Sequence, residues 1–153
     1  MEVKIKLNGG IMPQKATEGA AAYDLYVPED VVLEKGRQII DLKFSMELPN
    51  GYAATIQPRS GFSAKGMEAV MANTSTEERI DADVIRGLID QDYRGNVGVI
   101  IINRDYNDTL IVKKGTRIAQ MQIIKVPDVE LVEVEELSET DRGEGGFGST
   151  GTK

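Results

Sequence analysis

The chain contains no cysteine and no histidine, and each absence excludes whole classes of chemistry. Without cysteine there can be neither disulfides nor thiol catalysis. Without histidine there can be no Ser-His-Asp triad and none of the usual zinc sites. Positive charge is also in short supply, since the net charge is −7, which argues against a surface that coats nucleic acid. Domains that coat nucleic acid normally present a basic face, so we expect no nucleic-acid partner.

Long apolar runs are absent as well, and the start of the chain does not resemble a signal peptide. We therefore expect no membrane partner and a soluble protein in the cytoplasm, of the host cell if the gene is viral or from a phage. The 153 residues are most simply one domain with a core of its own.

Short segments that alternate apolar and polar residues recur along the chain, separated by turn residues, and they predict an all-β sandwich or barrel. A short helix is expected at residues 61–70, and the polar residues 73–79 are predicted to form a loop. The predicted strands cover residues 3–7, 31–33, 38–48, 52–57, 97–103, 109–112, 117–126 and 129–135.

The last dozen residues, from Arg142 to Lys153, hold five glycines, one aromatic ring and three hydroxyl side chains. Such a segment cannot fold alone, because ordering glycine costs the most entropy. It could be an ordinary flexible terminus. It could instead close over a nucleotide, with glycine N–H groups and Arg142 on phosphate and Phe147 on the base.

Asp90 lies in a charged turn between Gly87 and Gly95, directly after two apolar residues. A carboxylate at the rim of a pocket can act as a general base toward water, and Tyr93 could pack against a sugar. A hairpin turn with an Asx-type hydrogen bond is the alternative interpretation.

Three further segments offer groups for an anion or a cation. Ser60 or Ser63 could cap the short helix beside Arg59, either as an anion site or as an ordinary N-cap; the spacing is not that of a Walker loop. Gln120 could donate to a phosphate oxygen. Asp24 could hold a magnesium-bound water or simply accept backbone hydrogen bonds.

Taken in order, these five segments resemble the five motifs of the homotrimeric deoxyuridine triphosphatase (dUTPase) family, and together they span nearly the whole chain. In order along the chain, the matching segments are residues 22–25 (Ala-Tyr-Asp-Leu), 58–66 (beginning Pro-Arg-Ser-Gly), 87–95 (Gly-Leu-Ile-Asp-Gln-Asp-Tyr-Arg-Gly), 115–120 (Gly-Thr-Arg-Ile-Ala-Gln) and 142–151.

The resemblance implies a jelly-roll-like β domain over residues 1–137, with a polar insertion at about 71–84, and a flexible lid over residues 138–153. It implies a homotrimer with three active sites shared between subunits. The implied reaction is hydrolysis of dUTP to dUMP and pyrophosphate with Mg²⁺, which lowers dUTP and supplies the precursor of dTMP.

The resemblance also implies a role for individual residues. Asp90 resembles the base that activates water, Tyr93 the residue that excludes a 2′-hydroxyl, and Asp24 the acidic residue linked to the metal through water. Magnesium itself would be held mainly by the substrate phosphates. The implied phosphate ligands are Arg59, Ser60, Gly61, Gln120, Arg142, Ser149 and Thr150; Phe147 would stack on uracil, and Val84, Leu88, Ile89, Gly98 and Gly148 complete the substrate-binding set.

The chain departs from the family pattern at Ala22, where glycine is usual, and in the longer stretch between Gly66 and Gly87. The uracil-reading hairpin of the family lies in that stretch. Two alternatives stay open at this point: a dCTP deaminase-like enzyme of the same fold, and a regulatory module that binds nucleotide and a protein partner without turnover.

Overall fold

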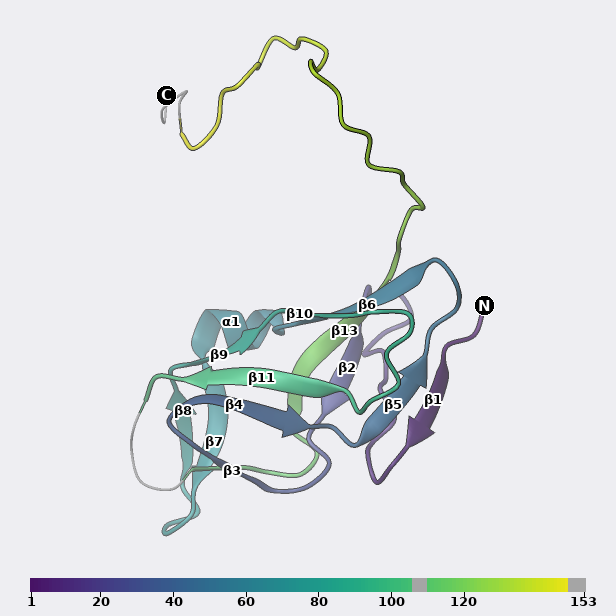
Figure 1. Ribbon diagram of the computed structural model, residues 1–153. Helices are drawn as coiled ribbons and strands as arrows, with labels where there is room; N and C mark the ends of the chain where they lie inside the picture. Colours follow the sequence, from purple (N-terminus) through teal and green to yellow (C-terminus); the bar gives the residue numbers. More distant parts are fainter. Residues whose placement is uncertain (106–109, 149–153) are drawn as a thin grey trace.

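The computed structural model describes residues 1–105 and 110–148, which form an almost entirely β structure with one short helix (Figure 1). This confirms the expected all-β class. The elements are β1 (Lys4–Leu7), β2 (Tyr23–Tyr26), β3 (Val31–Leu33), β4 (Gly36–Asp41), β5 (Phe44–Glu47), β6 (Tyr52–Gln57), α1 (Ser60–Lys65), β7 (Met67–Met71), β8 (Glu77–Ile80), β9 (Ala82–Ile85), β10 (Gly87–Ile89), β11 (Gly98–Asn103), β12 (Leu110–Val112) and β13 (Arg117–Lys125).

The strands form four small sheets around one core. Their orders are β10-β6-β13-β2, β4-β11-β9, β3-β12-β7-β8 and the pair β1-β5. Side chains that alternate inward along the strands fill the core, among them Leu25, Phe44, Val99, Ile101 and Ile118, all at most 1% exposed. Burial of this apolar area is the main stabilising term of the fold. No helix in the described ranges is long and apolar enough to cross a membrane.

The segment predicted as one strand at residues 38–48 is divided into β4 and β5. Lys43 has a positive φ of 56°, and its backbone N–H donates to Asp41 Oδ1 at 2.8 Å. Leu42 N donates to Val97 O and Val97 N to Phe44 O. A short polar residue that bonds the backbone two positions on favours a turn over a continuous strand.

The predicted helix at 61–70 is wrong beyond its first turns. Helix α1 ends at Gly66, whose φ of 80° suits glycine. A Cβ at Gly66 would also overlap the carbonyl oxygen of Ile80. The chain then turns into β7, which pairs with β8 over Met67↔Ile80 to Val70↔Glu77. The prediction of a loop at 73–79 is therefore correct only up to Thr76.

The strand predicted at residues 129–135 is not formed. After β13 the described chain has no further strand, and it leaves the body as an extended arm (Figure 1). The arm is exposed throughout, with Leu131 93% and Leu137 86% accessible. A period-2 pattern becomes a strand only when a neighbouring strand accepts its hydrogen bonds. The single chain offers no such neighbour to the arm.

Candidate functional site

Asp90 lies at the end of β10, on the edge of the sheet that contains β6. The register pairs Ile89 with Ala54, so the buried Ile89 anchors the strand and Asp90 follows it into solvent. The turn is held by Gln91, whose Oε1 accepts from Gly51 N at 3.1 Å and whose Nε2 contacts Asn50. Asp90 thereby lines an open cleft of about 740 Å³.

The Tyr93 side chain folds over the turn that contains it and is fixed there by hydrogen bonds. Its N–H donates to Asp90 O at 3.2 Å, and its hydroxyl donates to Asn96 O at 2.8 Å. A Cβ at Gly95 would overlap the tyrosine ring, so glycine is required for this arrangement. With both ends of the side chain fixed and 47% of it exposed, the ring offers a rigid surface next to Asp90.

The remaining residues predicted near the base lie around the same corner. Val84 is 5% exposed, so a ligand could reach only its backbone, whereas Leu88 is 65% exposed. In the antiparallel pairing of β11 with β9, Ile100 lies opposite Ile85. Gly98 comes two residues earlier in β11, so it lies near Gly87, at the start of β10. Leu88, Ile89, Asp90 and Tyr93 therefore lie in one short segment at this corner with Gly98 near its start, whereas Val84 lies farther back, in β9.

A second cluster surrounds Asp24 in β2. This carboxylate is 8% exposed and lies between two guanidinium groups, at 3.4 Å from Arg59 Nε and 3.6 Å from Arg117 Nη1. The buried charge is thus compensated twice. The sequence analysis missed Arg117, although its place as the first residue of the predicted strand, within the fourth segment, was a usable signal.

Gln120 connects this cluster to the second segment. It lies opposite Asp24 in the β13–β2 register, and its Nε2 donates to Pro58 O at 3.1 Å.

Ser60 and Gly61 begin helix α1. The N-cap is Arg59, without a side-chain cap hydrogen bond, so the expectation that Ser60 or Ser63 caps the helix is wrong.

Asp30 fixes the turn that leads into β13. Its carboxylate accepts from Lys113 Nζ and from Lys114 N, both at 2.8 Å. The hydrogen bond from Lys113 is the main reason that the pKa of Asp30 lies below its ordinary value. Gly115 follows with a φ of 85° and donates to Val27 O. This turn sets where Arg117 enters the strand.

The two clusters lie at opposite ends of β6. Asp90 follows Ile89, which pairs with Ala54 near the start of β6, while Gln120 pairs with Gln57 at its end. A strand rises about 3.3 Å per residue, so Ala53 and Gln57 alone are about 13 Å apart. One chain therefore does not bring Asp90 into contact with Arg59 and Gln120.

The described part of the tail touches itself and not the body. Arg142 Nε donates to Gly145 O at 2.7 Å, and Gly145 N donates to Arg142 O at 3.1 Å. Phe147 is fully exposed and has a φ of 51°, followed by Gly148 at 77°. Ser149 and Thr150 lie outside the described residues.

Comparison with known proteins decides between the interpretations. The family model for dUTPase matches residues 8–151, which is nearly the whole chain. The chain belongs to the dUTPase family. This membership covers all five segments, and it favours neither the deaminase-like nor the regulatory alternative.

Individual relatives agree over their full length. The deoxyuridine 5′-triphosphate nucleotidohydrolase of Nautilia profundicola is 43% identical, with 99% of each chain covered. That of Hydrogenobaculum sp. is also 43% identical, over 93% of this chain and 91% of that protein. A Staphylococcus bacteriophage 80alpha dUTPase, solved with dUpNHpp, superposes with a TM-score of 0.81 at 29% identity, covering 99% of both chains. The dUTPase-like jelly-roll fold is thereby confirmed.

Proposed function

We propose that this chain hydrolyses dUTP to dUMP and pyrophosphate, with Asp90 as the base that activates water. The observation that carries the proposal is the rim position of Asp90, anchored by the buried Ile89 and next to the rigid Tyr93 ring. The dUTPase family match over residues 8–151 supplies the reaction.

In this mechanism the Asp90 carboxylate accepts a proton from water, and the water oxygen attacks the α-phosphorus. The bond from the α-phosphorus to the bridging oxygen breaks, and pyrophosphate leaves with the electron pair. Reactions of this type need positioning and charge neutralisation more than covalent help from the protein. Arg59 and Gln120 are suited to hold the phosphates, and the glycine-rich tail with Arg142 and Phe147 to exclude water.

Magnesium would neutralise charge on the phosphate oxygens. The residues fit an ion that arrives with the nucleotide: the described ranges contain no cluster of three acidic side chains that could hold a metal. Asp24 is already paired with Arg59 and Arg117, so we propose that it meets the ion through water. Mg²⁺ commonly keeps several waters and binds to substrate phosphates.

The assay that tests the reaction is pyrophosphate release from dUTP, dCTP, dTTP and UTP with Mg²⁺, with an EDTA control. We expect release from dUTP alone. Release from several nucleotides would contradict uracil selectivity and keep the chemistry. No release from any of the four, with dUTP tightly bound, would contradict the enzymatic function.

Substitution of Tyr93 by alanine should weaken the rejection of UTP. The hydroxyl of Tyr93 is fixed on Asn96 O, so the ring cannot move away from a ribose 2′-hydroxyl. We expect the ratio of kcat/KM for UTP over dUTP to rise about tenfold, in the range of one lost packing contact. Tyr93→Phe keeps the ring and removes its hydrogen bond to Asn96, so this variant separates the bulk of the ring from its fixation. An unchanged ratio in Tyr93→Ala would remove Tyr93 as the sugar filter.

We further propose that the active enzyme is a homotrimer with shared active sites. Because Asp90 and the Arg59–Gln120 cluster lie at opposite ends of β6, a complete site needs residues from more than one subunit.

The outer face of the β4-β11-β9 sheet supports association. There Ile100 lies between Ile39 and Ile85 in register, with Ile39 70% exposed. Such a stripe is typical of an interface.

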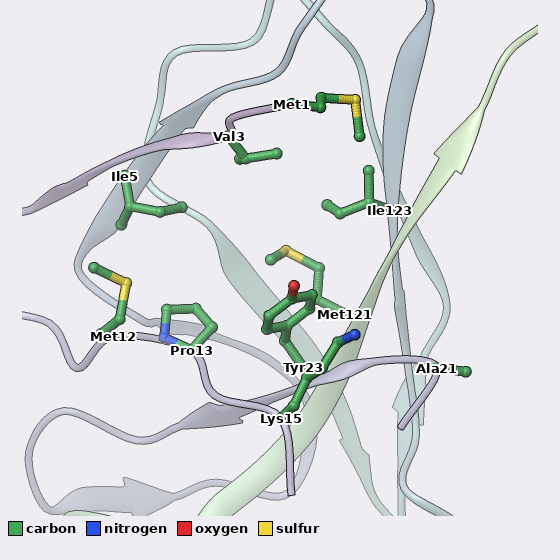
Figure 2. A pocket seen from close by; sticks show the side chains of 10 residues that line it. All are labelled: Met1, Val3, Ile5, Met12, Pro13, Lys15, Ala21, Tyr23, Met121 and Ile123. Atoms are coloured by element: carbon green, nitrogen blue, oxygen red, sulfur yellow. The ribbon is translucent and has the colours of Figure 1, made fainter. Parts of the chain in front are cut away.

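The arm that follows β13 offers a second contact. On the body, an apolar cavity of about 420 Å³ lies between β1 on one side and β2 with β13 on the other (Figure 2). Val3, Ile5 and Met121 point into it in Figure 2. We propose that residues 129–137 of a neighbouring subunit occupy this cavity and pair with the free edge of β1. Lys15, which lines the cavity, complements the glutamates of the arm.

The substitution Leu131→Glu tests this contact without disturbing the subunit, because Leu131 is 93% exposed and touches no core. We expect the trimer to dissociate at micromolar concentration, since each copy loses about 2 kcal/mol of apolar burial. Sedimentation velocity measures the assembly, and Ser138→Glu is the matched control, because it introduces the same side chain at an exposed position just outside residues 129–137. A trimer of unchanged affinity would contradict the proposed position of the arm.

A further inference from the structure

The hairpin of β7 and β8 is fixed at its base against the phosphate-binding segment. Ile80 O approaches Gly66 so closely that only glycine fits. Arg79 Nη1 donates to Gly66 O at 3.3 Å, and Arg79 Nη2 contacts Glu68 Oε1 at 2.6 Å. The hairpin therefore places the guanidinium group of Arg79 at the C-terminal end of α1, the short helix that begins at Ser60.

This group enters a cavity of about 440 Å³ that lies beside the Asp24 cluster. Four cationic side chains line the cavity, Arg59, Lys65, Arg79 and Arg117, against a single carboxylate, Glu68. The whole chain carries a net charge of −7, so this is a local reversal of sign. A concave, cation-lined site focuses its field on anions, and arginine pairs well with phosphate oxygens.

We propose that this cavity binds the pyrophosphate end of the nucleotide, the β- and γ-phosphates, and that Arg79 and Lys65 position it. Arg59 and Arg117 line the cavity and pair with Asp24, so the cavity adjoins the proposed phosphate site. The inference rests on the phosphate site proposed above at Arg59. It adds a ligand from the longer stretch between Gly66 and Gly87, which the five segments do not include.

Glu68 gives the proposal a distinctive signature. Its carboxylate competes with phosphate for Arg79, and both side chains are at least half exposed, so the pair can open when a stronger anion arrives. If Arg79 only fixed the hairpin, loss of Arg79 or of Glu68 would break the same ion pair. Both substitutions would then change the affinity for pyrophosphate in the same direction. If Arg79 binds phosphate, removal of Glu68 strengthens binding and removal of Arg79 weakens it.

The test measures binding of inorganic pyrophosphate with Mg²⁺ by titration calorimetry on the full chain, with dUMP as the second ligand. For Arg79→Gln we expect pyrophosphate to bind about fivefold more weakly, and for Glu68→Gln about threefold more tightly. Binding of dUMP should stay unchanged in both. Arg104→Gln is the matched control, because it removes an arginine that pairs with an exposed carboxylate, Asp83, outside the cavity. Melting curves confirm that each variant is folded.

Shifts of the same sign in Arg79→Gln and Glu68→Gln, or no shift in Arg79→Gln, would overturn the inference. Arg59→Gln separates this failure from that of the phosphate site. If Arg59→Gln weakens pyrophosphate binding and Arg79→Gln does not, the phosphate site stands and Arg79 is only structural. If neither changes it, both proposals fail. If the KM for dUTP changes in parallel with the dissociation constant of pyrophosphate, the cavity binds the phosphates of the substrate as well as the released product.

Discussion

Replacement of Asp90 by asparagine should lower kcat for dUTP hydrolysis about 10³-fold, within the range for the loss of a general base. The amide keeps the size of the side chain and cannot take a proton from water. Because Asp90 is exposed and its turn is held by Gln91 and Tyr93, folding and nucleotide binding should be preserved. Single-turnover kinetics together with dUTP binding separate the two effects.

The neighbouring Asp92 provides the control for this experiment. It lines the same open cleft as Asp90, so Asp92→Asn removes an equal charge at almost the same place. We expect this variant to keep kcat within about threefold, since a screened surface charge has a small effect. If Asp92→Asn lost as much activity as Asp90→Asn, the charge of the cleft and not a specific base would account for the rate.

The sequence was sufficient to predict the parts of the fold that each segment determines locally. Strands β3, β6 and β11 lie where alternating or continuous apolar residues predicted them. The corner with Asp90 and Tyr93 was also predicted, because Gly87 and Gly95 mark both of its ends. In these places the apolar pattern and the turn residues agree, which is the condition for a secure prediction.

The errors have physical causes outside the local pattern. In residues 67–71 alternating side chains include Met67 and Ala69, which also suit a helix, and only the close approach of Ile80 O to Gly66 shows that the chain must turn. Residues 129–135 have strand periodicity, but no strand in the described ranges lies beside them to accept their hydrogen bonds. Arg117 was overlooked because its contact, Asp24, is distant in sequence and adjacent only across β2 and β13.

The site could be predicted only as a list of residues, because the positions of these residues relative to one another depend on the register of the sheet. Every segment could be named from order and spacing, but the register that separates Asp90 from Gln120 by the length of β6 is a property of the sheet. After β13 the arm and the tail project away from the body (Figure 1). In the proposed trimer, the exposed apolar arm and the incomplete site would have one cause, because residues needed by one subunit would be carried by another.

Truncation before Arg142 should leave folding and assembly intact and lower kcat/KM for dUTP by about 10²–10⁴-fold. The body loses no contact, since the described tail bonds only to itself, and the arm at 129–137 is kept. The lost groups are Arg142, which we propose as a charge-assisted phosphate ligand, and Phe147, which we propose as a stacking surface for the base. Each kind of contact is worth about 1–3 kcal/mol. Water would also reach the phosphates. Steady-state kinetics measure the loss, and sedimentation confirms the trimer.

The double substitution Arg142→Gln with Phe147→Ala isolates these two groups from the rest of the tail. Both side chains lie in a segment without contacts to the body, so the variant cannot act through stability. If the double variant reproduces most of the loss caused by truncation, the tail acts through those contacts. If it keeps near-normal activity while the truncated chain is inactive, closure depends on the glycine backbone, whose N–H groups can approach phosphate without a side chain. Full activity of the truncated chain would contradict the proposed lid, and the water-excluding group would have to be sought on the body.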